Sequence, residues 1–277
     1  MYADCHMHMV LDGVDWKNAI SRHQNAPDHD WIRNVLGTYR NKGVTYLRDG
    51  GDRWGVGAAA RELAPQYGIT YRTPFAPLCK AGHYGAFIGE KFENTRHFAE
   101  LVAKQRALGA DFIKIMISGL IDFNRFGVLT EEPLDGDEIR ELIHIAHEEG
   151  MAVMVHANGA RCVENAAAAG VDSVEHGAYL DGDALAAMTD CGTIWVPTLS
   201  TIANLRGTGR HPEQEIEKIL QSSLENAAVY KGLIAPGTDA GAFAVPHGSD
   251  TEEKLLHSAG ISPERIQAGI CAIMEKF

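Results

Sequence analysis

The sequence has few cysteines, and none of them form a CxxC pair. Five thiols are spread along the chain, an odd number that argues against a disulfide framework and favours reduced thiols in the cytoplasm. No run of 18 apolar residues occurs, so we expect no membrane-spanning helix, and the first residues lack the apolar segment of a secretion signal. The 25 basic and 37 acidic residues give a formal net charge of −12. So acidic a chain is a poor nucleic-acid binder, and we expect a cytoplasmic protein without nucleic-acid or membrane partners.

Glycine-rich phosphate loops are also missing. Neither GxGxxG nor GxxxxGK[ST] occurs, and the string GVGAAA at 55–60 falls short of both and is better suited to open a helix. Their absence argues against a doubly wound nucleotide-binding sheet. What is present is an ordinary globular composition, with 45% hydrophobic and 22% charged residues in 277 positions. That length suffices for one large domain or two small ones.

Short apolar runs alternate with helical patterns along the whole chain. Runs rich in β-branched residues and bounded by Gly or Asp predict strands at 2–8, 43–49, 68–75, 110–117, 151–156, 171–176, 192–198 and 233–239. Helices are predicted most clearly at 135–149, and also at 159–169, 213–231 and 263–275. In the first of these, Asp135 and Glu138 resemble a capping box, and Gly150 is suited to end the helix.

This alternation predicts an α/β fold. Strands that alternate with helices pair in parallel through right-handed crossovers. Eight such units in 277 residues fit a single (β/α)8 TIM barrel over residues 1–277, with an open doubly wound sheet as the main alternative. The longer loops, at about 9–30, 76–93 and 118–134, all follow strands. In a barrel they would build the face that carries the active site.

The first predicted strand contains an HxH motif, His6 and His8. Side chains at positions i and i+2 of a strand point the same way, so the two imidazoles can chelate one divalent cation. By the same alternation Asp4 would share their face, and Met7 would face the outer helices. Cys5, beside the motif, is interpreted as a buried thiol rather than a ligand.

Four further groups share this edge of the predicted sheet. Lys114 lies inside an otherwise apolar strand, either paired with an acid or, since burial favours the neutral amine, able to add carbon dioxide as a carbamate. His156, His176 and Asp239 each end a predicted strand, where barrel enzymes place catalytic groups. Each alone has an ordinary explanation, such as a helix cap for Asp239. With the HxH pair, six metal-competent groups meet at one edge, which favours a metal centre.

The six-residue pattern resembles the signature of the amidohydrolase superfamily. That signature has HxH on strand 1, a carboxylated Lys on strand 4, His on strands 5 and 6 and Asp on strand 8. The phrases GVTYLRDGG, AGHYG, ADFIKIMISG, AGVDSVEHGAYLD, WVPTLS and GTDAGAFAVPHG are similar to the imidazolonepropionase-like and metal-dependent prolidase branch. The resemblance runs from residue 3 to about 270. It implies a hydrolase that acts on an amide-like C–N bond of a small molecule, such as a dipeptide, an N-acyl amino acid or a cyclic amide.

The resemblance also implies roles for these residues. The implied ligands are His6, His8 and Asp239 for the more buried cation, His156 and His176 for the more exposed one, and the Lys114 carbamate as the bridge. The cofactors would be carbon dioxide, held as that carbamate, and two divalent ions. Zinc is the first choice for these ions, and manganese, cobalt, iron and nickel are also compatible. Asp239 would serve as general base and then as general acid.

Substrate contacts are expected on the loops after the strands. His83, in AGHYG, resembles a branch residue near the acidic end of the substrate. Tyr179, Arg125 and His247 are further candidates for substrate binding.

The sequence departs from the branch in three ways. One is that AGICAIMEKF replaces the common Ala-Thr-x-Asn-Pro-Ala run near the end. The small β-sandwich that usually accompanies the barrel is missing, which suggests a bare barrel and a possible homo-oligomer. Asn158 stands where a His or Tyr often helps to hold a substrate carboxylate. Three other functions stay open: a lactonase or phosphotriesterase, a mononuclear deaminase and a non-catalytic binding barrel. The deaminase is disfavoured by Lys114 and by the lack of HxxE after His156.

Overall fold

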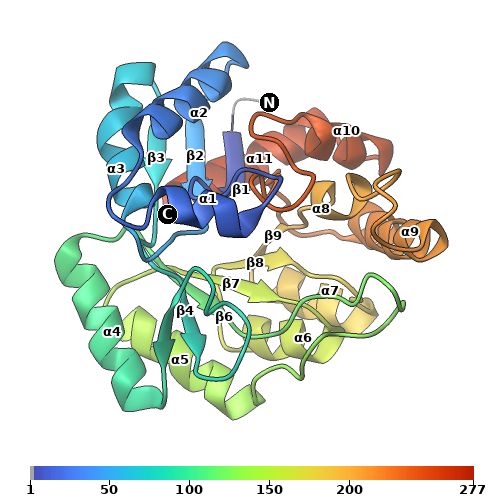
Figure 1. Ribbon diagram of the computed structural model, residues 1–277. Coiled ribbons are helices and arrows are strands. Elements are labelled where there is room, and N and C mark those ends of the chain that lie inside the picture. The colour runs from blue at the N-terminus through green and yellow to red at the C-terminus, as the bar shows by residue number, and fades with distance from the viewer. Residues whose placement is uncertain (1–2) are drawn as a thin grey trace.

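Parallel strands and covering helices alternate along residues 3–277, the part of the chain that the computed structural model describes (Figure 1). Met1 and Tyr2, the latter the first residue of the predicted first strand, lie outside the described residues. The strands are β1 (Ala3–Met7), β2 (Tyr46–Asp49), β3 (Thr70–Arg72), β4 (Leu78–Lys80), β5 (Glu90–Phe92), β6 (Ile113–Met116), β7 (Val153–Ala157), β8 (Ser173–His176) and β9 (Ile194–Val196).

The helices follow the strands as crossovers require. They are α1 (Trp16–Arg22), α2 (His29–Asn41), α3 (Val56–Leu63), the 3-10 turn η1 (Ala64–Tyr67), α4 (Thr95–Leu108), α5 (Gly136–Glu148), α6 (Ala160–Ala168), α7 (Gly182–Asp190), α8 (Ser200–Ala203), α9 (Glu213–Val229), α10 (Thr251–Ser258) and α11 (Pro263–Lys276). Within residues 3–277, no helix is both long enough and apolar enough to cross a membrane.

All strand pairs run parallel, in the orders β1-β2-β3 and β5-β4-β6-β7-β8-β9. The third barrel position is divided between β3 and β4. The N–H of Asp111 donates to the carbonyl of Thr73 at 3.0 Å, and Leu78 is in register with Ile115 of β6. Pro74 and Pro77 lie between β3 and β4, and proline cannot donate to a ladder, so the strand is interrupted there.

The segment 233–240 closes the sheet between β9 and β1. It forms only isolated bridges rather than a regular strand, since Pro236 has no N–H to contribute. Five backbone bonds of 2.7 to 2.9 Å join it to its neighbours. They are Trp195 N–H to Leu233 O, Ala235 N–H to Trp195 O, Cys5 N–H to Pro236 O, Asp239 N–H to His6 O and His8 N–H to Ala240 O. The eight strand positions therefore form the predicted (β/α)8 barrel.

Helix α5 illustrates how the sequence builds the outer layer. The side chain of Asp135 caps its first turn by accepting from the N–H of Asp137, and Gly150 beyond its end has a φ of 72°. Glu138 does not complete a capping box, because its carboxylate pairs with Lys80 at 2.7 Å. The buried face of α5 consists of Ile139, Leu142, Ile143 and Ala146. Helices α6 and α9 also lie within their predicted segments, and α11 ends at Lys276, one residue beyond its predicted end.

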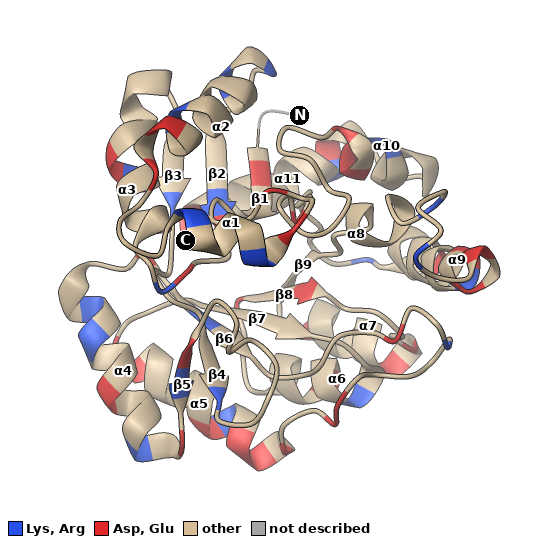
Figure 2. Ribbon diagram, in the orientation of Figure 1, with Lys and Arg blue, Asp and Glu red and all other residues tan. Residues whose placement is uncertain are grey.

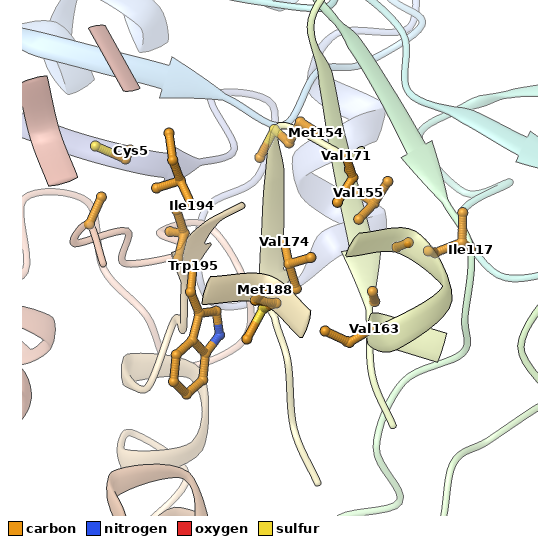
Figure 3. Packing of buried hydrophobic residues seen from close by; sticks show 14 of the residues in the cluster. Cys5, Ile117, Met154, Val155, Val163, Val171, Val174, Met188, Ile194 and Trp195 are labelled. Carbon is orange, nitrogen blue, oxygen red and sulfur yellow. The ribbon is translucent and has the colours of Figure 1, made fainter. Parts of the chain in front are cut away.

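The main hydrophobic core lies between the barrel and its helices. Val155 of β7 and Val174 of β8 belong to one buried cluster with Val163 of α6 and Met188 of α7 (Figure 3). Fully burying a side chain of this size contributes about 1.5–3 kcal/mol, so this layer holds the strand ends in place. Charged residues lie mainly on the helices and loops (Figure 2).

Three parts of the chain differ from the predicted loops. Helix α1 and the start of α2 occupy the predicted loop 9–30, and β4 and β5 occupy the predicted loop 76–93. An isolated antiparallel bridge between Ile121 and Leu129 shapes the predicted loop 118–134. These elements are short, and their burial depends on the barrel beneath them rather than on a strong local pattern.

Candidate metal centre

A cavity of about 570 Å³ opens at the carboxyl ends of the barrel strands. Its wall includes all six side chains that the sequence predicts as metal ligands: His6, His8, Lys114, His156, His176 and Asp239. Parallel strands bring their carboxyl ends to the same edge, and this convergence follows from the fold.

Three of these side chains form a close cluster. The ligand atoms of His6, His8 and Asp239 all lie within 4.8 Å of one another. Oδ1 of Asp239 lies 3.5 Å from Nε2 of His6 and 3.2 Å from Nε2 of His8. His6 Nε2 and Asp239 Oδ1 are buried and have no hydrogen-bond partner among the described residues. Buried polar atoms are normally paired, so these atoms fit a shared cation.

His156 and His176 lie beside this cluster. Their ring centroids are 4.5 Å apart, and the His176 ring is 5.1 Å from that of His6. Oγ1 of Thr198 lies 2.6 Å from Nδ1 of His176. Nε2 of His156 lies 3.2 Å from the carbonyl oxygen of Gly119. In the tautomer that donates this hydrogen bond, the proton is on Nε2 and the lone pair is on Nδ1.

The charge states of these residues suit metal binding. Burial, reinforced by Lys114, lowers the pKa of His156 to about 3, and burial also lowers the pKa of His6 and His176 well below the usual value. Burial alone would raise the pKa of Asp239, but the neighbouring His6 and His8 outweigh it and lower the pKa. Neutral imidazoles and an ionised carboxylate are the forms that bind divalent ions.

Lys114 is buried in β6 between Ile113 and Ile115. Burial lowers the pKa of its amine to about 8, although the carboxylates of Glu175 and Asp239 oppose that shift. Lys114 therefore supplies more neutral amine near neutral pH than an exposed lysine does, and the neutral amine is the nucleophilic form.

Two neighbouring residues of β8, Glu175 and His176, both point toward His6. Alternation along a strand would send Glu175 and His176 to opposite faces. His176 instead has a left-handed φ of 69°, and both side chains reach His6 in the barrel interior. Asp239 is left-handed as well, with a φ of 54°. Such conformations are costly for non-glycine residues and concentrate at functional sites.

The expectation for Asp4 is wrong, whereas that for Cys5 is confirmed. The register between β1 and β2 shifts between Asp4 and Met7, which breaks the strand alternation. Asp4 therefore does not join the histidines; its carboxylate accepts from the hydroxyls of Tyr39 in α2 and of Thr238. Cys5 is a buried free thiol whose pKa is raised by burial.

None of the four predicted substrate contacts lies on the cavity wall. His83 Nδ1 lies 3.5 Å from Glu131 Oε1, and Arg125 Nε lies 3.2 Å from Asp122 Oδ2. The Tyr179 ring lies 5.2 Å from the Phe126 ring, and His247 Nε2 lies 2.9 Å from the carbonyl oxygen of Leu11. Within residues 3–277, these side chains contact other protein groups, although the buried hydroxyl of Tyr179 has no hydrogen-bond partner there.

Other loop residues line the cavity instead. Tyr84, next to His83 in AGHYG, has its ring 4.9 Å from that of His156. Asn158 joins two loops, since its amide donates to the carbonyl of Gly119 and accepts from the N–H of Ala178. The apolar part of the wall includes Leu11, Trp16, Phe87, Leu120 and Phe243. No periodicity in the sequence marks these residues, although Tyr84 belongs to the AGHYG phrase.

Comparison with known proteins identifies a family. The model of the amidohydrolase family matches residues 31–211. An uncharacterized protein of Mycobacterium tuberculosis is 28% identical over 205 residues, which cover 70% of this chain and 54% of that protein. Ochratoxinase of Aspergillus niger is 25% identical over 310 residues, which cover 92% of this chain and 62% of the enzyme. The chain thus spans little more than half the length of these curated relatives.

Solved structures share the fold. A Xaa-Pro dipeptidase with methionine bound in its active site superposes with a TM-score of 0.75 at 22% identity, covering 97% of this chain and 72% of that one. The crystal structure of Aspergillus niger ochratoxinase superposes with a TM-score of 0.74 at 21% identity, covering 96% of this chain and 68% of that chain. At such identities the likeness shows the barrel architecture.

Proposed function

Because the chain belongs to the amidohydrolase family, we propose that it is a metal-dependent hydrolase of an amide-like C–N bond. The proposed centre holds two divalent cations, zinc by preference, bridged by a carboxylated Lys114. The observation that carries the proposal is the cluster of His6, His8 and Asp239, in which a buried imidazole nitrogen and a buried carboxylate oxygen have no partner among the described residues.

The proposed ligands divide between two positions. His6, His8 and Asp239 would hold one cation, His156 and His176 the other, and the Lys114 carbamate would join them. When bound, the two ions would supply Lewis acidity to a carbonyl and lower the pKa of water.

The protein's own groups would manage the proton. Asp239, buried and kept ionised by its histidine neighbours, would accept a proton from the attacking water and release it to the departing nitrogen. Thr198 would hold the ring of His176 through Nδ1. The apolar side chains of the cavity wall would limit the access of other water to the reacting bond.

The cavity wall supports a substrate with a bulky apolar portion. Trp16 of α1 and Phe87 pack edge to face, with their ring centroids 5.6 Å apart, and both line the cavity. Such walls bind apolar groups of small molecules. Dipeptides, N-acyl amino acids and cyclic amides with an aromatic or branched side chain are therefore the proposed substrates. Relatives named Xaa-Pro dipeptidase and ochratoxinase support the choice of compounds to test.

One experiment tests this proposal. The protein is stripped of metal, reconstituted with zinc, manganese or cobalt in the presence of bicarbonate, and assayed against dipeptides, N-acyl amino acids, cyclic amides and lactones. We expect about two ions per chain and metal-dependent release of an amine. Hydrolysis that persists in the metal-free protein would contradict the proposal. Turnover of lactones alone would replace it with the lactonase alternative.

A further inference from the structure

Glu175 lies in the barrel interior directly against the proposed ligand His6. Oε2 of Glu175 is 2.7 Å from Nδ1 of His6, on the side of the ring away from Asp239. Both side chains are fully buried. A carboxylate only accepts hydrogen bonds, so this contact requires that His6 carry its proton on Nδ1. The lone pair of His6 is then on Nε2, the buried atom without a partner in the metal cluster.

The other oxygen of Glu175 is held equally firmly. Oε1 accepts from Nη2 of Arg48 at 2.8 Å and from the hydroxyl of Ser173 at 2.6 Å. Arg48 is itself fully buried, donates through Nε to the carbonyl of Cys5 at 2.7 Å and stacks on the ring of Phe277 at 4.4 Å. The carboxylate therefore cannot rotate without leaving the buried guanidinium unpaired, which would be costly.

Two of the other proposed histidine ligands, His8 and His176, lack this arrangement. Nδ1 of His8 has no hydrogen-bond partner among the described residues. His176 meets a hydroxyl, which can donate or accept and so leaves the ring tautomer open. Within residues 3–277, the charged partner of Nδ1 thus sets His6 apart from both.

We propose that Glu175, oriented by Arg48, is a positioning residue that fixes His6 in its Nδ1–H form so that Nε2 faces the first cation. This inference rests on the proposed function, since it assigns a role toward that metal. Carboxylates that accept from the second nitrogen of a metal-binding histidine fix its ring and increase its basicity, and their loss costs about 10–100-fold in metal affinity.

The geometry makes Glu175→Gln an unusually specific probe. The amide has one acceptor and one donor end. Arg48 offers only donors to its side of residue 175, and the Ser173 hydroxyl, which accepts from Nη1 of Arg48 at 2.9 Å, directs its own proton there. Both should therefore turn the amide oxygen toward themselves. The amide NH₂ would then face His6 and donate to Nδ1, which forces the imidazole proton onto Nε2 and blocks the metal-facing atom.

The test uses the full chain and two measurements. Zinc affinity is measured by competition with a chromophoric chelator, and the tautomer of His6 is read from histidine side-chain ¹⁵N shifts of the metal-free protein. We expect Glu175→Gln to bind its tightest zinc at least about tenfold more weakly and to move the His6 proton from Nδ1 to Nε2. Glu252→Gln is the matched control. It changes another fully buried carboxyl group, whose Oε2 accepts from Ser200 away from the cavity, and should leave zinc affinity unchanged.

The possible outcomes separate this inference from the proposed function. If the wild-type protein bound no metal and hydrolysed nothing, the proposed function would fail, while the His6 tautomer would still decide the present inference. Equal zinc affinity in Glu175→Gln and the wild type would overturn the positioning role alone. If Glu175→Gln did not fold, the wild-type tautomer would decide: a proton on Nε2 of His6 contradicts the inference, and a proton on Nδ1 supports it.

Discussion

Oδ1 of Asp239 and Nε2 of His8 lie 3.2 Å apart, although their residues come from opposite ends of the sequence. The carboxylate oxygen is buried without a hydrogen-bond partner among the described residues, so its environment is completed by something else. A cation held jointly by both residues would complete it.

Replacing Asp239 with Asn should remove catalysis more completely than metal binding. The amide keeps an oxygen for the cation but cannot accept a proton, so we expect kcat to fall by about 10²–10⁴-fold. Steady-state kinetics and metal content of the reconstituted variant provide the measurement. Asp250→Asn, which alters an exposed carboxylate paired with Lys254, should retain wild-type values. A comparable kcat in both variants would argue against a proton-transfer role.

Lys114→Ala should remove the proposed bridge and lower the metal content. We expect metal content to fall from about two ions to one or fewer per chain, with activity lost and then partly restored by a short carboxylic acid that occupies the space. Elemental analysis and assays with added acetate or propionate provide the readout. Lys104→Ala is the control, because that amine pairs with Glu90 on the surface. Full metal content in Lys114→Ala would rule out a bridging role.

Carboxylation of Lys114 should depend on pH in a defined direction. Only the neutral amine adds carbon dioxide, and burial lowers the pKa of Lys114 to about 8. At a fixed concentration of dissolved carbon dioxide, the metal-free protein should therefore form carbamate at least about tenfold faster at pH 8 than at pH 6. The ¹³C NMR signal of labelled carbamate measures this rate. A rate that kept rising steeply above pH 10 would indicate an unshifted amine.

Trp16 should matter only for substrates with large apolar groups. Its side chain is 48% exposed at the cavity and packs against Phe87. Trp16→Ala should raise KM for such substrates by about tenfold, since a few tens of square ångströms of apolar contact contribute about 1.4 kcal/mol. Small substrates should be unaffected. Leu108→Ala, an exposed apolar change on α4 away from the cavity, is the control.

Asp172, just before β8, should stabilise the amino-terminal end of the barrel strands, and this contribution should depend on pH. Burial alone would raise the pKa of Asp172, but hydrogen bonds from His147, Lys276 and the N–H of Val153 outweigh it and lower the pKa. A lowered carboxyl pKa stabilises the fold above the unfolded value near 3.8, and this contribution is lost as pH falls through the folded value.

Asp172→Asn should accordingly lower the free energy of unfolding by about 2 kcal/mol at pH 7. Urea unfolding at pH 7 and pH 3 measures the effect, and the difference from wild type should shrink at the lower pH. Glu100→Gln removes an exposed pair with Arg96 and should cost about 0.5 kcal/mol or less at either pH. An Asp172 effect as small as that of Glu100 would contradict the prediction.

Much of the barrel could be predicted because its strands and helices carry strong local patterns. The segment that became α5 shows its apolar face, its Asp135 cap and its Gly150 stop in the sequence itself. The bounds of the third and eighth strands were harder to predict. Pro74, Pro77 and Pro236 interrupt the hydrogen-bond ladder there, and which residues still pair depends on the neighbouring strands. Short strands such as β4 and β5 are stabilised by the sheet they join.

The metal cluster could be predicted because strand ends meet at one edge whatever the loops do. The other residues around the cavity could not be predicted, because no period governs where Tyr84, in a loop, or Trp16, at the start of α1, points. The role of Glu175 could not be predicted for another reason. Regular alternation places it opposite His176, and only the left-handed backbone at His176 brings both side chains to His6.

Closure of the barrel between β1 and the segment 233–240 has a consequence for folding. His6 and Asp239 approach each other only when these two distant segments bond, through the N–H of Asp239 and the carbonyl of His6. A nascent chain on the ribosome therefore cannot assemble the cluster of His6, His8 and Asp239 until segment 233–240 has emerged and docked. Local opening between β1 and this segment would separate His6 from Asp239, so the occupancy of the proposed cation should depend on the closure of the barrel.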